Sequence, residues 1–171
     1  MEKGAIWVST VLYILISLAI IGMVIAAVTP RINSARDKAT IEQSIIMLNE
    51  LDSTIQKASQ VQGTKLKQEF KMSRGFLIID SINEKITWQL NNSAYQYSEE
   101  GVLINVGNIE AKTIKAANGW NVALTLNYGN ANINLTSEIK MLQPAEIPYK
   151  LWIENVGLDN TNKIILNITS S

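Results

Sequence analysis

Three asparagines of the chain stand in N-x-S/T triplets, where the asparagine amide can accept an N-linked glycan. They are Asn91 in Asn91-Asn92-Ser93, Asn134 in Asn134-Leu135-Thr136 and Asn167 in Asn167-Ile168-Thr169. The triplet is frequent by chance in a chain rich in asparagine. Asn134 and Asn167 each lie between two apolar residues, so strand alternation would turn both amides to the solvent face. Glycosylation is therefore a hypothesis that is better supported at these two positions than at Asn91.

The sequence contains few other residues suited to chemistry. It has no cysteine and no histidine, which excludes thiol nucleophiles, imidazole bases, disulfides and Cys/His zinc sites. Asp80 and Glu84 flank one predicted hairpin connection, but a solvated surface explains them better than a calcium site does. Trp88, Trp120 and Trp152 are better explained by packing than by a sugar-binding platform. We expect no enzyme activity, no metal and no cofactor.

The charge balance argues against nucleic acid as a partner. Lys plus Arg and Asp plus Glu both total 15, so the formal net charge is +0. A nucleic-acid-binding surface needs an excess of basic residues to neutralise phosphates. We therefore predict no contact with nucleic acid.

A long apolar segment near the start of the chain precedes the three asparagine triplets. No residue between Gly4 and Pro30 is charged, and residues 5–28 are apolar or small with few exceptions. Such a run is long enough to cross a ~30 Å hydrocarbon layer as one helix. It is too long for the apolar region of a secretory signal, which has about 7–15 residues. It is apolar on every side, so it must lie in lipid or inside a protein bundle.

Two sequence features bear on how this helix packs and bends. Gly22 and Ala26 form a small-xxx-small pair, a spacing that lets neighbouring apolar helices approach closely. Small residues are common in membrane helices, so ordinary composition explains the pair slightly better than a packing role does. Pro30 interrupts a pattern that stays helical on both sides, which predicts a kink near residue 30.

The helix is expected to continue as an amphipathic segment over residues 31–62. Apolar residues recur there at spacings of three and four, with polar residues such as Asp52 assigned to the other face. The apolar stripe consists of Ile41, Ile45, Leu48, Leu51, Ile55 and Ala58, broadened by Ile46 and Met47. Gly63 is predicted to end the helix as a left-handed cap. The whole helix, residues 5–62, would be about 85 Å long.

After Gly63 the apolar period changes to two, which predicts a β-rich head over residues 64–171. Strands are expected near residues 66–72, 76–79, 86–90, 95–97, 102–106, 120–128, 133–135, 149–153 and 164–168. Residues 108–115 are less regular, Asn118-Gly119 is a turn signal, and Pro144 and Pro148 bracket a linker. The predicted fold class is α+β: a long kinked N-terminal helix followed by an antiparallel sandwich-like head, partly covered by the apolar stripe.

The four residues before the apolar run carry a family resemblance. Met1-Glu2-Lys3-Gly4 is a short polar leader that ends in Lys-Gly and is followed at once by Ala5 and the apolar helix. This arrangement resembles the class III signal of type IV prepilins, more closely that of archaeal pilins and archaellins than that of bacterial pilins. The resemblance covers about residues 1–60 in order and continues as a general likeness of the β-rich head. One departure is Ser9, which stands where bacterial pilins carry a glutamate.

The resemblance implies a function for each part of the chain. A prepilin peptidase would remove residues 1–4 by cutting between Gly4 and Ala5, with Lys3 as the basic residue of the signal. An assembly ATPase and a membrane platform protein would then drive polymerisation. The apolar helices would form the filament core and the heads its outer surface, in adhesion or in motility. The chain would be membrane-inserted as a precursor, single-pass with the head outside, and later part of an extracellular filament.

Alternatives remain open at this point. The chain could be a membrane-anchored extracellular β-domain that binds a ligand, or a minor pilin-like component of a secretion or DNA-uptake machine. Orientation is also contested, because Lys3 precedes the span whereas Arg31, Arg36 and Lys38 follow it. The positive-inside tendency alone would place the head in the cytoplasm. The leader, the amide-rich head and the placement of the triplets favour an exterior head.

Overall fold

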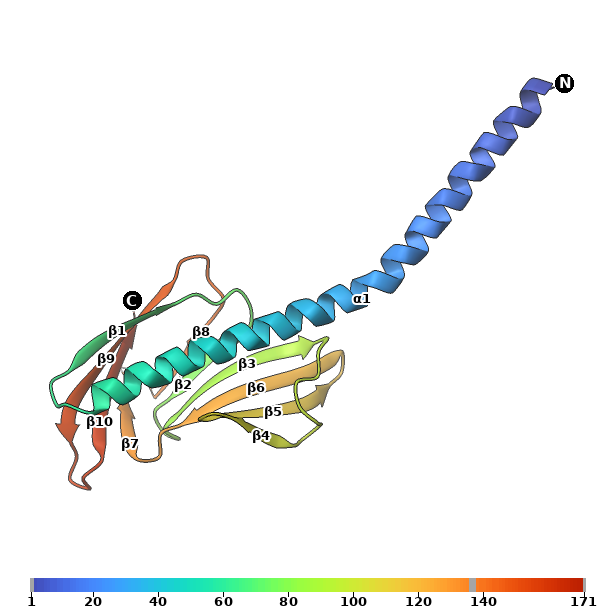
Figure 1. Ribbon diagram of the computed structural model, residues 1–171. Helices are drawn as coiled ribbons and strands as arrows, with labels where there is room; N and C mark the ends of the chain where they lie inside the picture. The colour runs from blue at the N-terminus through green and yellow to red at the C-terminus, as the bar shows by residue number, and fades with distance from the viewer. Residues whose placement is uncertain (1, 136–137, 171) are drawn as a thin grey trace.

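The computed structural model describes residues 2–135 and 138–170, with side chains described from residue 7 onward. Met1 of the predicted leader and Thr136 of the second glycosylation triplet therefore lie outside the described residues. The described chain has two parts, a long helix and a β-rich head (Figure 1). This is the α+β class that the change of apolar period predicts.

The helix α1 (Glu2–Ser59) is continuous and includes Pro30. Figure 1 shows it changing direction between the half that projects from the head and the half that lies on it. Proline removes one backbone hydrogen bond and crowds the preceding turn, which is a sufficient cause for such a bend. The predicted C-terminal boundary at residue 62 is three residues too far. Gly63 has the predicted left-handed conformation, with φ of 81°, but it follows a short turn rather than the last helical residue.

The head consists of strands arranged in two sheets. They are β1 (Lys65–Phe70), β2 (Phe76–Asp80), β3 (Lys85–Ser93), β4 (Leu103–Val106), β5 (Ile109–Ala116), β6 (Gly119–Asn127), β7 (Ala131–Asn134), β8 (Ile139–Leu142), β9 (Tyr149–Leu158) and β10 (Ile164–Ser170). The four-stranded sheet has the order β1-β9-β10-β7, and the six-stranded sheet has the order β4-β5-β6-β3-β2-β8. Neighbours pair antiparallel except β10 with β7, which pair in parallel.

Three strand predictions are wrong. Tyr95 and Tyr97 alternate but form no strand, because the Ser93 hydroxyl bonds both the amide and the carbonyl of Tyr95 and holds a local turn. Residues 108–115, expected to be irregular, lie almost entirely within β5. Its core-facing residues include the small Ala111 and the polar Thr113, so its apolar alternation is weak. The edge strand β8 was not expected at all.

The core lies where the apolar stripe of α1 meets both sheets. All six predicted stripe residues are buried: Ile41, Ile45, Leu48, Leu51, Ile55 and Ala58. Met47 joins them, but the prediction for Ile46 is wrong, since that side chain is 59% exposed. Trp88 from β3 is fully buried in the same core. The amphipathic half of α1 is thus part of the domain interior and not a separate stalk beneath it.

The opposite environments of Leu48 and Ile46 give a test of this packing. Leu48→Ala should lower the free energy of unfolding by about 3 kcal/mol, because it removes buried methyl groups and leaves a cavity. Ile46→Ala, at a nearby but exposed position, should change it by less than about 0.5 kcal/mol. Denaturant unfolding of the full chain in detergent, followed by tryptophan fluorescence to which buried Trp88 contributes, measures both values. Equal losses would contradict the packing described.

Candidate functional site

The most unusual surface of the molecule is the projecting half of α1. Every described side chain from Trp7 to Asn33 is exposed. Bulky apolar residues are not shielded by the head: Trp7 is 75% exposed, Met23 73% and Ile25 59%. Among the described residues this helix is long and apolar enough to cross a membrane, by length and composition. Its apolar surface requires lipid or other apolar helices around it, because water disfavours exposed apolar area.

The polar side chains on this helix are compatible with such surroundings. The Ser17 hydroxyl donates to the Tyr13 carbonyl at 2.8 Å, and the Thr29 hydroxyl donates to the Ile25 carbonyl at 2.7 Å. Hydroxyls that bond within their own helix need no water. Gly22 has open space around it, with nothing within 4 Å of the position that a Cβ would occupy. Gly22 and exposed Ala26 therefore leave a notch that a neighbouring helix could enter.

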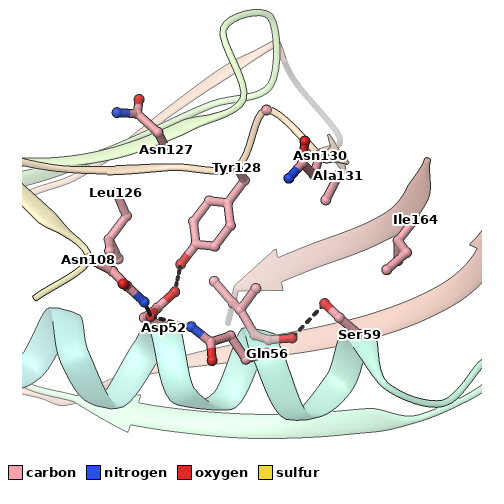
Figure 2. A pocket seen from close by; sticks show the side chains of 12 residues that line it. Asp52, Gln56, Ser59, Asn108, Leu126, Asn127, Tyr128, Asn130, Ala131 and Ile164 are labelled. Carbon is pink, nitrogen blue, oxygen red and sulfur yellow. Dashed lines mark hydrogen bonds between the residues drawn. The ribbon is translucent and has the colours of Figure 1, made fainter.

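The other half of α1 is fixed to the head by a buried carboxylate, shown in Figure 2. Asp52 is 7% exposed, so the prediction that it lies on the polar, solvent-facing side of the helix is wrong. One of its oxygens accepts a bond from the Tyr128 hydroxyl at 2.9 Å. The other accepts from the amide groups of Asn108 at 2.9 Å and Gln56 at 2.7 Å. These donors compensate the cost of burying the charge and connect α1 to the six-stranded sheet.

The same contact changes the acidity of Tyr128. Burial raises the pKa of the Tyr128 hydroxyl far above its usual value, and the Asp52 charge and hydrogen bond raise it further. The phenol therefore stays protonated and remains a donor to Asp52. A cavity of about 370 Å³ lies beside this pair and is bounded by Ile55, Asn130 and Ile164 among others. The pair itself is explained as a structural link between helix and head.

A second buried carboxylate lies closer to the projecting half of the helix. Asp37 is 3% exposed, and one of its oxygens is bonded to the Arg74 guanidinium. Its other oxygen accepts from the Ala94 amide at 2.6 Å. Asp37 therefore joins α1 to the segment between β1 and β2 and to the segment that follows β3. Together Asp37 and Asp52 hold the helix at two points along the head.

Asn155 provides a third link, at the end of the helix. It is 4% exposed, and its amide nitrogen donates to the carbonyls of Ala58 at 3.1 Å and Ser59 at 3.2 Å. The last carbonyls of a helix have no partner within it, so Asn155 of β9 satisfies groups that would otherwise be unpaired. The three contacts leave the amphipathic half of α1 little freedom relative to the head.

The residues singled out in the sequence do not form one common site. Lys3, Gly4 and Ala5 belong to the first turns of α1, at the opposite end from the head. Asn91 and Asn134 are exposed, whereas Asn167 is half-buried. Asn134 and Asn167 are register partners on β7 and β10.

The hydroxyl and carboxyl groups near the other candidate sites are already engaged. Ser93, the third residue of the Asn91 triplet, is fully buried. The Asp80 carboxylate accepts from the amides of Ile82 and Asn83. Glu84 accepts from the amide of Ile133 at 2.5 Å. These two carboxylates are thus occupied by N–H donors, which explains them without a cation.

Sequence reasoning missed Asp37, Asp52, Arg74 and Asn155. Two of them carried a signal: Asp37 lies four residues before Ile41 and Asp52 four residues after Leu48, so both fall on the buried stripe. No local pattern indicates Arg74 or Asn155, whose partners are distant in the sequence.

No protein-family model matches the chain, and neither a curated protein nor a solved structure shows significant similarity to it.

The buried Asp52 predicts a clear mutational effect. Asp52→Ala should lower the free energy of unfolding by about 2 kcal/mol, because the half-buried Tyr128 hydroxyl and the exposed amides of Asn108 and Gln56 lose a charged acceptor. Glu50→Ala removes an exposed carboxylate two residues earlier and should change it by less than about 0.5 kcal/mol. Denaturant unfolding of the full chain in detergent measures both. A loss for Asp52→Ala no larger than the control would show that Asp52 contributes little.

The raised pKa of Tyr128 predicts a dependence on alkaline pH. Above about pH 10 the unfolded chain releases the Tyr128 proton while the folded chain keeps it, so stability falls as pH rises. One such group contributes a slope of about 1.4 kcal/mol per pH unit. Tyr128→Phe should remove this slope while retaining the slopes of other groups. Unfolding free energies of wild type and variant between pH 10 and 11 test this, and parallel curves would contradict it.

Proposed function

We propose that the chain is the structural subunit of a type IV pilus-like surface filament of the archaeal type. In this proposal residues 5–28 form the filament core with copies of themselves, and the heads form the outer surface. The observation that carries it is the all-round exposure of the projecting half of α1. A second support is the firm attachment of the other half to the head through Asp37, Asp52 and Asn155.

The energetics of assembly fit such a helix. The precursor holds its apolar half in the bilayer, and packing against other copies replaces lipid by protein without exposing the surface to water. Close helix packing in apolar surroundings depends on small residues that allow backbones to approach. Gly22 and Ala26 supply these on the exposed surface.

Processing of the leader is the step that commits the chain to assembly. A prepilin peptidase cuts between Gly4 and Ala5, reading Lys3 as part of its signal, and leaves Ala5 as the new amino terminus. A membrane platform protein and an assembly ATPase then extract the helix from lipid into the filament. The precursor is single-pass with its head outside, and adhesion and motility are both functions that such a filament performs.

Glycans on the head belong to the same proposal. Asn134 is the most exposed of the favoured positions, and Asn167 lies directly beside it on the neighbouring strand. Since adjacent strands are about 4.8 Å apart, a glycan at one position hinders attachment at the other. Peptide masses of the native protein that show Asn91, Asn134 and Asn167 all unmodified would contradict this part of the proposal.

Leader removal provides the decisive test. In the native host, intact mass of the purified protein should correspond to a chain that begins at Ala5. Gly4→Phe should block cleavage, because the bulky side chain occupies the residue before the scissile bond, and the variant should keep its full leader. Glu2→Gln, which retains Lys3 and Gly4, should be processed normally.

Filament formation is measured in the same cells. Material sheared from the surface should contain the processed chain in fibres, and the Gly4→Phe strain should release none. A retained leader together with the absence of fibres in wild type would overturn the proposal. That result would instead favour a single-pass membrane anchor that carries a binding domain.

A further inference from the structure

A polar cavity lies at the end of the head from which the apolar half of α1 emerges. Its volume is about 520 Å³, and we call it the collar pocket. The side chains that matter in it are those of Asn33, Arg36, Asp37, Arg74, Asn92 and Asn118. Figure 1 shows that the end of β3 and the turn between β5 and β6 lie at this end of the head.

The charges of the collar pocket favour an anion. Arg36 and Arg74 contribute two guanidinium groups, opposed by one carboxylate, that of Asp37. Both oxygens of Asp37 are already engaged, one by Arg74 and the other by the Ala94 amide. None of the ion pairs among the described residues involves Arg36. One positive charge is therefore in excess, and a guanidinium matches the geometry of phosphate oxygens well.

Two glycines hold the walls of the pocket in place. Beside Arg74, Gly75 adopts φ of 75° and lies so close to Trp88 that a Cβ would be 2.6 Å from its ring. Beside Asn118, Gly119 adopts φ of 133°, and a Cβ there would be 2.5 Å from the Ser93 carbonyl oxygen. These close approaches require glycine. They hold the backbone next to Arg74 and Asn118 close to the core.

The position of the collar pocket along the helix identifies the source of the anion. Asn33 and Arg36 follow Val28, the end of the apolar run, by about 8 and 12 Å along the helix axis. Long side chains on a helix lean toward its N-terminus, which here is the side of the membrane span. The headgroup layer extends about 5–8 Å beyond the hydrocarbon core. The pocket thus opens at the level of lipid headgroups when residues 5–28 span a bilayer.

We infer that the collar pocket binds the phosphate group of an anionic membrane lipid, with Arg36 as its principal contact. The amides of Asn33, Asn92 and Asn118 supply further hydrogen-bond donors. The bound headgroup neutralises the excess charge and sets the depth and tilt at which the subunit sits in the bilayer. This inference rests on the membrane-inserted stage of the proposed function and does not depend on filament formation.

The test uses the full chain in nanodiscs of equimolar phosphatidylglycerol and phosphatidylcholine, with retained lipids counted by native mass spectrometry. Wild type should retain phosphatidylglycerol in preference to phosphatidylcholine. Arg36→Gln should lower that preference about tenfold or more, because it removes a charge-assisted contact with the phosphate. Arg31→Gln removes the same charge closer to the span but outside the pocket, and should lower it by no more than about fivefold, the factor that one basic residue supplies at an anionic surface.

Other outcomes overturn the inference in distinguishable ways. Equal losses in the two arginine variants would show that general surface charge suffices and that the pocket has no role. Binding of inorganic phosphate to the detergent-solubilised chain that depends on Arg36, without any lipid preference in nanodiscs, would assign the site to a free anion. Wild type that inserts without preferring phosphatidylglycerol would overturn the lipid site alone. A chain that fails to enter the bilayer would overturn both this inference and the proposed function.

Discussion

One constraint governs the molecule: a single helix must satisfy two different surroundings. Its amphipathic half completes the core of the head, with Ile41, Leu48 and Leu51 fully buried. The described side chains of its projecting half are exposed on all sides from Trp7 to Asn33. Because the same helix continues through Pro30, whatever surrounds the apolar half also determines where the head lies. The function of the protein therefore has to be sought in what covers this helix.

The links between helix and head are polar although an apolar stripe surrounds them. Apolar contacts alone are non-directional, and a smooth stripe could slide or rotate against the sheets. Asp52 bonded to Tyr128, and Asp37 bonded to Arg74, each permit one register of the helix. Burying these charges costs desolvation energy that the hydrogen bonds offset only in good geometry. The arrangement thus favours a defined orientation over maximal stability.

The sequence predicts the larger features well because they depend on local periodicity. The change from helical to alternating spacing at Gly63 and the buried stripe of α1 follow from single segments of chain. Strand β5 escaped prediction because its burial depends on neighbours from elsewhere. Thr113 of β5, for instance, is fully buried because its hydroxyl accepts a bond from the Ser98 amide. Strand β8 escaped because it exposes Ile139 and Met141 and forms by pairing with the distant β2.

The polar contacts of the helix were only half predictable. The spacing of Asp37 and Asp52 places them on the apolar stripe, so position along the helix indicates their burial even though both are charged. Their partners could not, because Arg74 and Tyr128 are 37 and 76 residues away in sequence. The parallel pairing of β7 with β10, which brings Asn134 beside Asn167, is likewise a property of the folded chain alone.

The rigid connection also bears on the choice between a filament subunit and a tethered receptor. A receptor on a single-pass anchor needs only a flexible linker, because its head must search for a ligand. In this chain the helix enters the head, is bonded at Asp37 and Asp52, and is capped by Asn155. Packing of many such helices side by side would then repeat the heads at fixed positions. A continuous outer surface follows from that repetition, and a rigid helix–head junction is the property that it requires.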